Sequence, residues 1–230
     1  MILECRDICY QYPNAEAPVF DRLSFRIEAP GFHALFGSSG VGKTSLAKII
    51  TQRISGFSGE VTTPIENGLL YTYNLERLPD WSQVGKHLEK ITPPHEKSRL
   101  EALVALFGLQ GHLTSRFSRL SLGQQNRVNL IRYLLQDFEL MILDESLANV
   151  DEKTRERIIF TIKAQFPNKC FLYISHNLAE IAEFCDHIFV LRSREKSPQM
   201  LLINGQNRIA NSPPNHKKLS GTMLEIMNAV

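Results

Sequence analysis

The feature that most constrains the fold is the segment Gly37–Thr44, which fits the pattern G-x-x-x-x-G-K-[ST]. A short apolar run, Phe32–Phe36, precedes it, and apolar residues at helical spacing follow over Lys43–Ile54. A glycine-rich loop between a buried strand and a helix can turn its backbone N–H groups inward, and the helix adds the positive end of its dipole. A chance Gly/Ser loop would lack this context. The segment therefore predicts a phosphate-binding loop, with Lys43 on phosphate oxygens and Thr44 on Mg²⁺.

Two further apolar runs predict buried strands, at Leu140–Leu143 and Cys170–Ile174. Between them, Glu152–Phe166 reads as a helix that Pro167 stops. Such alternation favours a mainly parallel sheet with crossover helices. The N-terminal part, which ends in the alternating segment Leu23–Ile27, reads as antiparallel β-structure. The predicted fold class is α/β, a phosphate-loop core with a mainly parallel sheet and an antiparallel β subdomain.

A helical subdomain is predicted at about 79–136, inserted between two strands of the sheet. Ser98–Phe107 and Gly123–Gln136 have helical spacing there, and strand signals are missing. We expect one domain over residues 1–230, since internal repeats and low-complexity tracts are absent from the sequence.

The C-terminal part, about 193–230, predicts a hairpin and a helix. Met200–Ile203 reads as a strand, and Asn204-Gly205 is a typical tight hairpin turn. An apolar stripe then follows helical spacing at Leu219, Met223, Ile226, Met227 and Val230. We expect this stripe to pack on the chain's own core, with a dimer contact as the alternative.

Composition excludes some classes of protein. The net charge is +2 with both signs spread along the chain, so no nucleic-acid partner is implied. The four cysteines match neither a zinc site nor a redox pair, which favours reduced thiols in a cytosolic protein. No apolar run approaches the roughly 18–20 residues that cross a bilayer.

Two adjacent acids, Asp144 and Glu145, end the predicted strand Leu140–Leu143. Neighbouring carboxylates are costly unless a cation or a proton needs them. Asp144 is placed to hold the Mg²⁺ set by Thr44, and Glu145 suits a general base that polarises an attacking water. The alternative is an N-cap for the next helix, because acids favour that position.

Three further motifs appear in the order found in the ATP-binding cassette (ABC) ATPases, and the chain resembles that family. Leu120–Gln124 resembles the signature sequence LSGGQ, Ala148–Asp151 resembles the D-loop, and Ser175-His176 resembles the switch histidine. Tyr12 is similar to the aromatic residue that stacks on adenine. The resemblance covers nearly everything from Ile2 to Arg192.

The resemblance implies ATP and Mg²⁺ as ligands and a set of site residues. Glu145 and His176 would be catalytic; for His176 the alternative is a helix-capping or core histidine. Thr44, Asp144 and Asn74 would ligate Mg²⁺. The nucleotide-binding residues would be Tyr12, Gly37, Ser38, Ser39, Gly40, Val41, Gly42, Lys43, Thr44, Ser45, Asn74, Ser121, Gly123, Gln124 and Asp151.

Four positions depart from the family pattern. Leu122 replaces a glycine of the signature sequence, Ser146 replaces a proline, and Val150 replaces a leucine. Asn74 stands where the Q-loop normally begins with glutamine, so its amide starts one methylene closer to the backbone. Trp81, in the same loop, is similar to a tryptophan that nitrate, sulfonate and taurine importers carry near the membrane partner. The alternative is a core residue, because a lone Trp more often packs inside its own domain.

The resemblance implies an ATPase subunit that powers transport through a separate integral membrane permease. A second copy would close each site head-to-tail, on the cytoplasmic face of the inner membrane, and the Q-loop favours a bacterial importer. One alternative function is that of an ABC ATPase acting on DNA or the ribosome. This alternative is disfavoured, because the sequence has no basic stripe. Another is a regulatory cassette that binds ATP without turnover, which Asn74 and Leu122 suggest.

Overall fold

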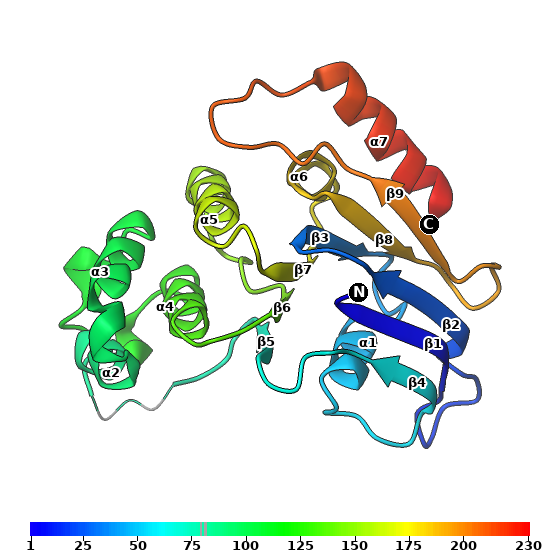
Figure 1. Cartoon of the computed structure of the whole chain (residues 1–230), viewed down its shortest axis with the longest axis horizontal. Coiled ribbons are helices and arrows are strands. Elements are labelled where there is room, and N and C mark those ends of the chain that lie inside the picture. Colours follow the sequence, from blue (N-terminus) through cyan, green and yellow to red (C-terminus); the bar gives the residue numbers. More distant parts are fainter. Residues whose placement is uncertain (79, 81) are drawn as a thin grey trace. The chain divides into compact units, whose positions relative to one another are not determined.

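The computed structural model describes residues 1–78, 80 and 82–230 (Figure 1). Trp81, the predicted contact with a membrane partner, lies outside the described residues. The chain divides into two compact units. The first comprises residues 1–71, 139–144 and 167–230, and the second comprises residues 72–138 and 145–166.

A six-stranded sheet with the order β5-β6-β7-β3-β8-β9 carries the predicted phosphate loop. Its strands are β5 (Leu69–Tyr73), β6 (Leu140–Asp144), β7 (Cys170–Ile174), β3 (Gly31–Phe36), β8 (His187–Leu191) and β9 (Met200–Asn204). The strands β6, β7, β3 and β8 run parallel, and β9 is antiparallel to β8. Every residue of β6 and β7 is buried, which explains their continuous apolar sequences. The predicted α/β class with a parallel-rich sheet is confirmed.

Strands β1 and β2 pair antiparallel, as predicted for the N-terminal part, and β4, which was not predicted, completes the three-stranded antiparallel sheet β2-β1-β4. Its strands are β1 (Leu3–Tyr10), β2 (Phe20–Ile27) and β4 (Ser58–Thr62), and helix α1 (Lys43–Ile50) follows the phosphate loop. Leu3, Phe20 and Leu46 share one buried core with Ile142 and Leu172 of the larger sheet. Burial raises the pKa of the Cys5 and Cys170 thiols to about 12, so both behave as small apolar side chains.

The predicted hairpin turn at Asn204-Gly205 is wrong. Strand β9 pairs antiparallel with β8, the strand that precedes it in the chain. The Gly205 N–H donates to the Asp186 carbonyl at 2.7 Å, so the chain does not turn back at Asn204-Gly205 to pair with β9. The chain then reaches α7 (His216–Ala229), which packs on β9 and on α6 (Leu178–Phe184) (Figure 1). Ile226 is fully buried there, whereas Met227 is 63% exposed, so the predicted apolar stripe is narrower than expected.

The second unit contains four α-helices among its described residues: α2 (Val84–Ile91), α3 (Lys97–Leu106), α4 (Leu122–Leu134) and α5 (Glu152–Gln165). Short 3₁₀ turns at Pro94–Glu96, Gln110–His112 and Phe117–Arg119 connect them. Their core contains Leu88, Leu103, Phe107, Ile131 and Ile158, all fully buried. The predicted helices within 79–136 therefore lie in this unit, together with α2, which the sequence analysis missed.

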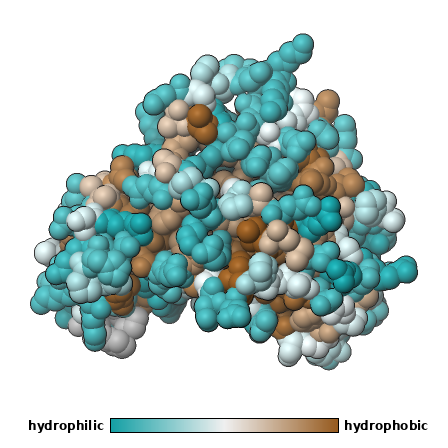
Figure 2. Space-filling model, in the orientation of Figure 1, coloured by the Kyte–Doolittle hydropathy of each residue, from teal (hydrophilic) through white to brown (hydrophobic). Residues whose placement is uncertain are grey.

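Polar residues predominate at the surface in view. Figure 2 shows hydrophilic residues (teal) over much of this face, with hydrophobic residues (brown) in smaller patches between them. Among the described residues, no helix combines the length and the apolar character that a bilayer span requires.

Candidate active site

The carboxyl ends of three neighbouring parallel strands form one edge of the larger sheet. Ile174, the last residue of β7, pairs with Asp144 of β6 on one side and with Leu35 of β3 on the other. Because the three strands end at the same level, the segments after them begin side by side. The phosphate loop, Asp144 and Ser175-His176 are therefore gathered at this edge.

The phosphate loop is wrapped around the Lys43 side chain. Its ammonium, in a residue only 7% exposed, donates to the Gly37 carbonyl at 2.8 Å and to the Ser38 carbonyl at 2.9 Å. Gly42, just before α1, has φ of 111°, and a Cβ there would lie 2.6 Å from Val19 Cγ1. Only glycine suits this position, and the left-handed turn aims the first backbone N–H groups of α1 along the loop.

Asp144 accepts two hydroxyl hydrogen bonds in a nearly dry position, being only 6% exposed. Thr44 Oγ1 donates to Asp144 Oδ2 at 2.8 Å, and the Tyr71 hydroxyl donates to the same oxygen at 2.9 Å. Carboxylate and hydroxyl oxygens held this close are the donors that a hard cation such as Mg²⁺ prefers. Tyr71 is a support that the sequence analysis missed, because nothing in its local pattern marks it.

Tyr12 lies beside the start of α1. Its hydroxyl and Ser45 Oγ are 2.7 Å apart, and Ser45 directly follows Thr44. The residue is 44% exposed, so its ring has a free surface on which a flat base could stack.

His176 is exposed and is the second residue after β7, separated from it by Ser175. The buried Glu180 carboxylate accepts from the Tyr173 hydroxyl and from Ser175 Oγ, while Asn177 caps α6 by accepting from the Glu180 N–H at 3.1 Å. These bonds hold the backbone on both sides of the histidine. Glu180 is a positioning group that no sequence pattern indicated.

Glu145 adopts φ of 52°, the left-handed region that non-glycine residues rarely enter. Such backbone conformations cost roughly 1–3 kcal/mol and gather at functional sites. The capping role considered for the acidic pair falls instead to Asp151, which caps α5 by accepting from the Thr154 N–H at 3.0 Å. That hydrogen bond holds the pKa of the Asp151 carboxyl below its usual value.

The signature segment begins α4 with a reciprocal pair of caps. Ser121 Oγ accepts from the Gln124 N–H at 3.3 Å, and Gln124 Oε1 accepts from the Ser121 N–H at 2.9 Å. The Gln124 amide nitrogen also lies 3.0 Å from His112 Nε2. The capping box fixes the start of a 13-residue helix, and its dipole makes that end attractive to anions.

Gly123 allows α4 to approach the D-loop. A Cβ at this position would lie 2.1 Å from the Asn149 carbonyl oxygen, which is backbone and cannot swing aside. Leu122, the departure from the family's glycine, is 47% exposed. The second signature glycine is therefore required by packing, and the first position tolerates a side chain.

We expect Gly123→Ala to lower the free energy of unfolding by about 1–3 kcal/mol, because it overpacks this contact. The matched change Leu122→Ala should alter it by less than about 0.5 kcal/mol, since it trims an exposed side chain. Denaturant unfolding followed by circular dichroism measures both. Equal losses of stability would contradict the contact between Gly123 and Asn149.

Asn74 is held by Asn126 of α4. One amide group, Asn126 Nδ2, donates to Asn74 Oδ1 at 2.9 Å and to the Ala148 carbonyl at 2.7 Å. The loop after Asn74 is anchored to the same helix through Glu76, by hydrogen bonds or ion pairs from Asn129, Arg132 and Tyr133. The start of the Q-loop, the signature helix and the D-loop thus meet within the second unit, a connection that the sequence analysis missed.

Comparison with known proteins gives the family. The profile of the ABC transporter family matches residues 20–148, more than half of the chain. The chain is 31% identical over 188 residues to the molybdenum import ATP-binding protein ModC of Photorhabdus laumondii, covering 74% of this chain and 53% of that protein. It is 27% identical over 208 residues to the spermidine/putrescine import ATP-binding protein PotA of Borrelia garinii, covering 83% and 60%. It is 28% identical over 213 residues to an ATP-dependent lipid A-core flippase of Xylella fastidiosa, covering 83% and 36%.

The chain thus spans between about a third and three fifths of the length of these curated relatives. The fold is shared with solved structures. A bacterial Atm1-family ABC exporter with ATP bound matches with a TM-score of 0.74 at 18% identity, over 99% of this chain and 41% of that chain. A putative metal-chelate type ABC transporter matches with a TM-score of 0.72 at 15% identity, over 90% and 84%. The chain therefore belongs to the ABC transporter family of ATPases.

Proposed function

We propose that this chain binds MgATP, hydrolyses it, and uses the cycle to power import through a separate membrane permease. The observation that carries the proposal is the 2.8 Å contact between Thr44 Oγ1 and Asp144 Oδ2, beside a glycine-rich loop with a buried lysine. This arrangement offers oxygen ligands for a cation next to backbone donors for phosphate. The residues present therefore suit a nucleoside triphosphate with its metal ion.

Within this site, the loop residues and Lys43 hold the phosphates, and Thr44 and Asp144 hold Mg²⁺. Asn74 contributes a further amide oxygen from the Q-loop. Bound Mg²⁺ neutralises charge on the β- and γ-phosphate oxygens. Tyr12 stacks on adenine, and Ser45 keeps the tyrosine hydroxyl in place.

Glu145 accepts a proton from the attacking water, and His176 orients that water and contacts the γ-phosphate. Glu145 directly follows β6, and His176 is the second residue after β7, and these two strands end at the same sheet edge. Asp144 continues the strand, whereas Glu145 has a left-handed backbone, so the two acids can serve different tasks.

A second copy of the chain supplies the other half of each site. Ser121, Gly123 and Gln124 at the start of α4, together with Asp151, act across a two-fold, head-to-tail interface. The N-terminal end of α4 carries the positive end of the helix dipole, which suits a γ-phosphate. ATP then bridges the two copies, and hydrolysis releases them.

The direction of transport and the location rest on the relatives. The two import ATP-binding proteins are matched over 60% and 53% of their length, against 36% of the flippase, so the chain is more like a separate ATPase subunit. We place it on the cytoplasmic face of the inner membrane, bound to an integral permease. Its net charge of +2 gives no support for a nucleic-acid partner. The whole chain, 1–230, acts as one ATP-binding domain with its helical subdomain at about 79–136.

The second candidate is a regulatory cassette that binds ATP without turnover. The bond from Asn126 Nδ2 to Asn74 Oδ1, at 2.9 Å, favours it, because the shortened Q-loop amide is already engaged within its own unit. The amide oxygen keeps a second lone pair, but the bond to Asn126 restrains the direction in which Asn74 can present it.

Steady-state phosphate release from the purified chain separates the two candidates. We expect turnover with MgATP that EDTA abolishes and that rises when the chain is reconstituted in lipid with its permease partner. Asn74→Gln should raise the basal rate, because the longer amide reaches further. ATP binding without turnover, alone and with the permease, would support the regulatory cassette. Turnover unaffected by EDTA would contradict the site built on Thr44 and Asp144.

A further inference from the structure

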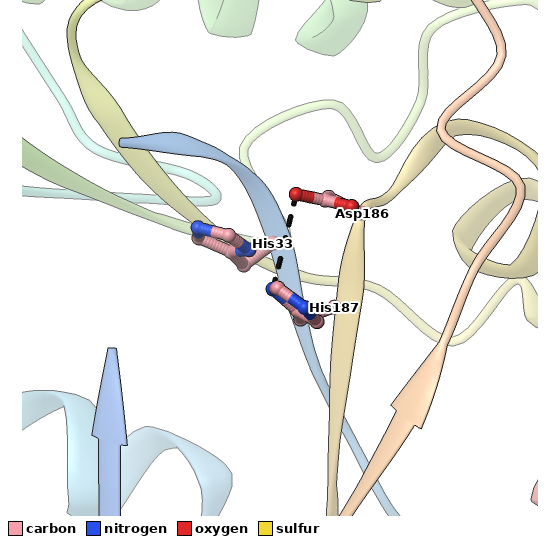
Figure 3. Close-up of side chains that lie close together, drawn as sticks. All are labelled: His33, Asp186 and His187. Carbon is pink, nitrogen blue, oxygen red and sulfur yellow. Dashed lines mark ion pairs between the residues drawn. The ribbon is translucent and has the colours of Figure 1, made fainter. Parts of the chain in front are cut away.

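His33, Asp186 and His187 form a cluster of metal-ligating side chains in the first unit (Figure 3). One ligand atom from each lies within 4.8 Å of the others, and His187 Nδ1 is 3.8 Å from Asp186 Oδ2. The register that pairs Ala34 with Ile188 puts His33 beside His187 in neighbouring strands, β3 and β8. Asp186 directly precedes β8 and His187 begins it, at the end of this parallel strand opposite to the carboxyl edge where the phosphate loop lies.

The orientation of His33 is that of a metal ligand. His33 Nε2 lies 3.1 Å from the Ala29 carbonyl oxygen, and since a carbonyl only accepts, Nε2 carries the proton. Nδ1 is then a lone-pair acceptor, and it is buried with no hydrogen-bond partner among the described residues. A buried acceptor without a partner is unfavourable. Histidines that bind metal typically donate their other ring N–H to a backbone carbonyl in this way.

The surroundings leave room at the cluster. Figure 3 shows a ring nitrogen of His33 on the side of the Asp186 carboxylate and the His187 ring. His33 is 1% exposed and fixed, whereas the side chains of Asp186 and His187 are 38% and 40% exposed and can turn. Residue 31 is glycine, and a Cβ there would crowd His33 Cε1 at 3.0 Å and lie 3.6 Å from Asp186 Oδ2.

We propose that His33, Asp186 and His187 bind a divalent transition-metal ion, with Zn²⁺ the best match. Two imidazoles and one carboxylate are ligands that Zn²⁺ takes at about 2.0–2.2 Å, and a water completes the tetrahedral shell. Bonds of that length bring the three ligand atoms closer than they lie here, which the two half-exposed side chains achieve by rotation. The ion would join β3 to β8 and satisfy His33 Nδ1, independently of nucleotide.

Isothermal titration of ZnCl₂ into the full chain tests this site. The protein carries no histidine tag, and the buffer contains excess Mg²⁺ and no nucleotide, so that Mg²⁺ competes with Zn²⁺ for Thr44 and Asp144. We expect one Zn²⁺ per chain and a rise in the melting temperature on binding. Co²⁺ in place of Zn²⁺ should give the visible absorption of an imidazole-ligated tetrahedral ion.

Variants of the two half-exposed residues make the test specific, because His33→Ala would open a hole in the core. His187→Ala and Asp186→Asn should each weaken Zn²⁺ binding at least about tenfold and remove the Co²⁺ spectrum. His95→Ala is the matched control, since His95 is a surface histidine 3.9 Å from the Glu96 carboxylate without a third ligand. The proposal is overturned if the folded chain binds no stoichiometric Zn²⁺, or if His187→Ala binds it as tightly as the unmodified chain.

Discussion

Glu145→Gln should lower ATP hydrolysis by a factor of about 10²–10⁴, the contribution expected of a general base. The amide has the same shape as the carboxylate but cannot accept a proton from water. MgATP still binds, because the phosphate loop, Thr44 and Asp144 are unchanged. An ATP-bridged dimer therefore accumulates. Phosphate release measures the rate, and size-exclusion chromatography with MgATP measures the dimer.

The control for this variant is Glu139→Gln. Glu139 directly precedes β6, at the opposite end of the strand from Glu145, and its carboxylate pairs with Lys169 at 2.7 Å. Removing this partly exposed charge should leave the turnover rate unchanged, since surface ion pairs contribute little. Turnover at the unmodified rate in Glu145→Gln would rule out its role as the base.

Lys43→Ala and Ser121→Arg should fail in different ways. Lys43→Ala removes the only lysine of the loop and weakens ATP binding about 10- to 100-fold, the loss of a charge-assisted hydrogen bond of roughly 1.5–3 kcal/mol. It also removes the two bonds to the Gly37 and Ser38 carbonyls that shape the loop. Ser121→Arg blocks the surface that a second copy would meet, so the monomer keeps its ATP affinity while dimer formation and hydrolysis are lost.

Titration of ATP into dilute monomer and chromatography at high concentration separate the two effects. Ser121 also caps α4, so its variant should lose about 1 kcal/mol of stability as well, which thermal unfolding reports. An equal loss of ATP affinity in both variants would refute the model in which two copies share each site.

The sequence was most informative where a contiguous pattern carries the structure. Strand Cys170–Ile174 has the predicted bounds, because a strand that is buried on both faces consists of consecutive apolar residues, so its two ends can be read from the sequence. Helix α5 begins at Glu152 as expected, because Asp151 caps it. The predicted helix Lys43–Ile54 ends early, at Ile50, since Gln52 turns left-handed with φ of 55°.

The predictions failed where contacts with another segment decide the structure. Asn204-Gly205 is a local turn signal, but β9 pairs with the strand before it, β8. Helix α2 has only eight residues, with Val84, Gly85 and Leu88 buried, which is too little periodicity to detect. The same holds for the site. The phosphate loop is contiguous and could be predicted, whereas Tyr71 supports Asp144, and Glu180 supports the segment before His176, from positions that carry no motif.

Asn126 couples the Asn74 side chain to the Ala148 backbone, because one amide group bonds both. Its Nδ2 has two hydrogens, and both are used, one toward Asn74 Oδ1 and one toward the Ala148 carbonyl. A substitution at position 74 therefore also changes the surroundings of the amide that holds the Ala148 carbonyl. The asparagine at the head of this Q-loop is thereby tied to the signature helix and, through the same amide group, to the D-loop.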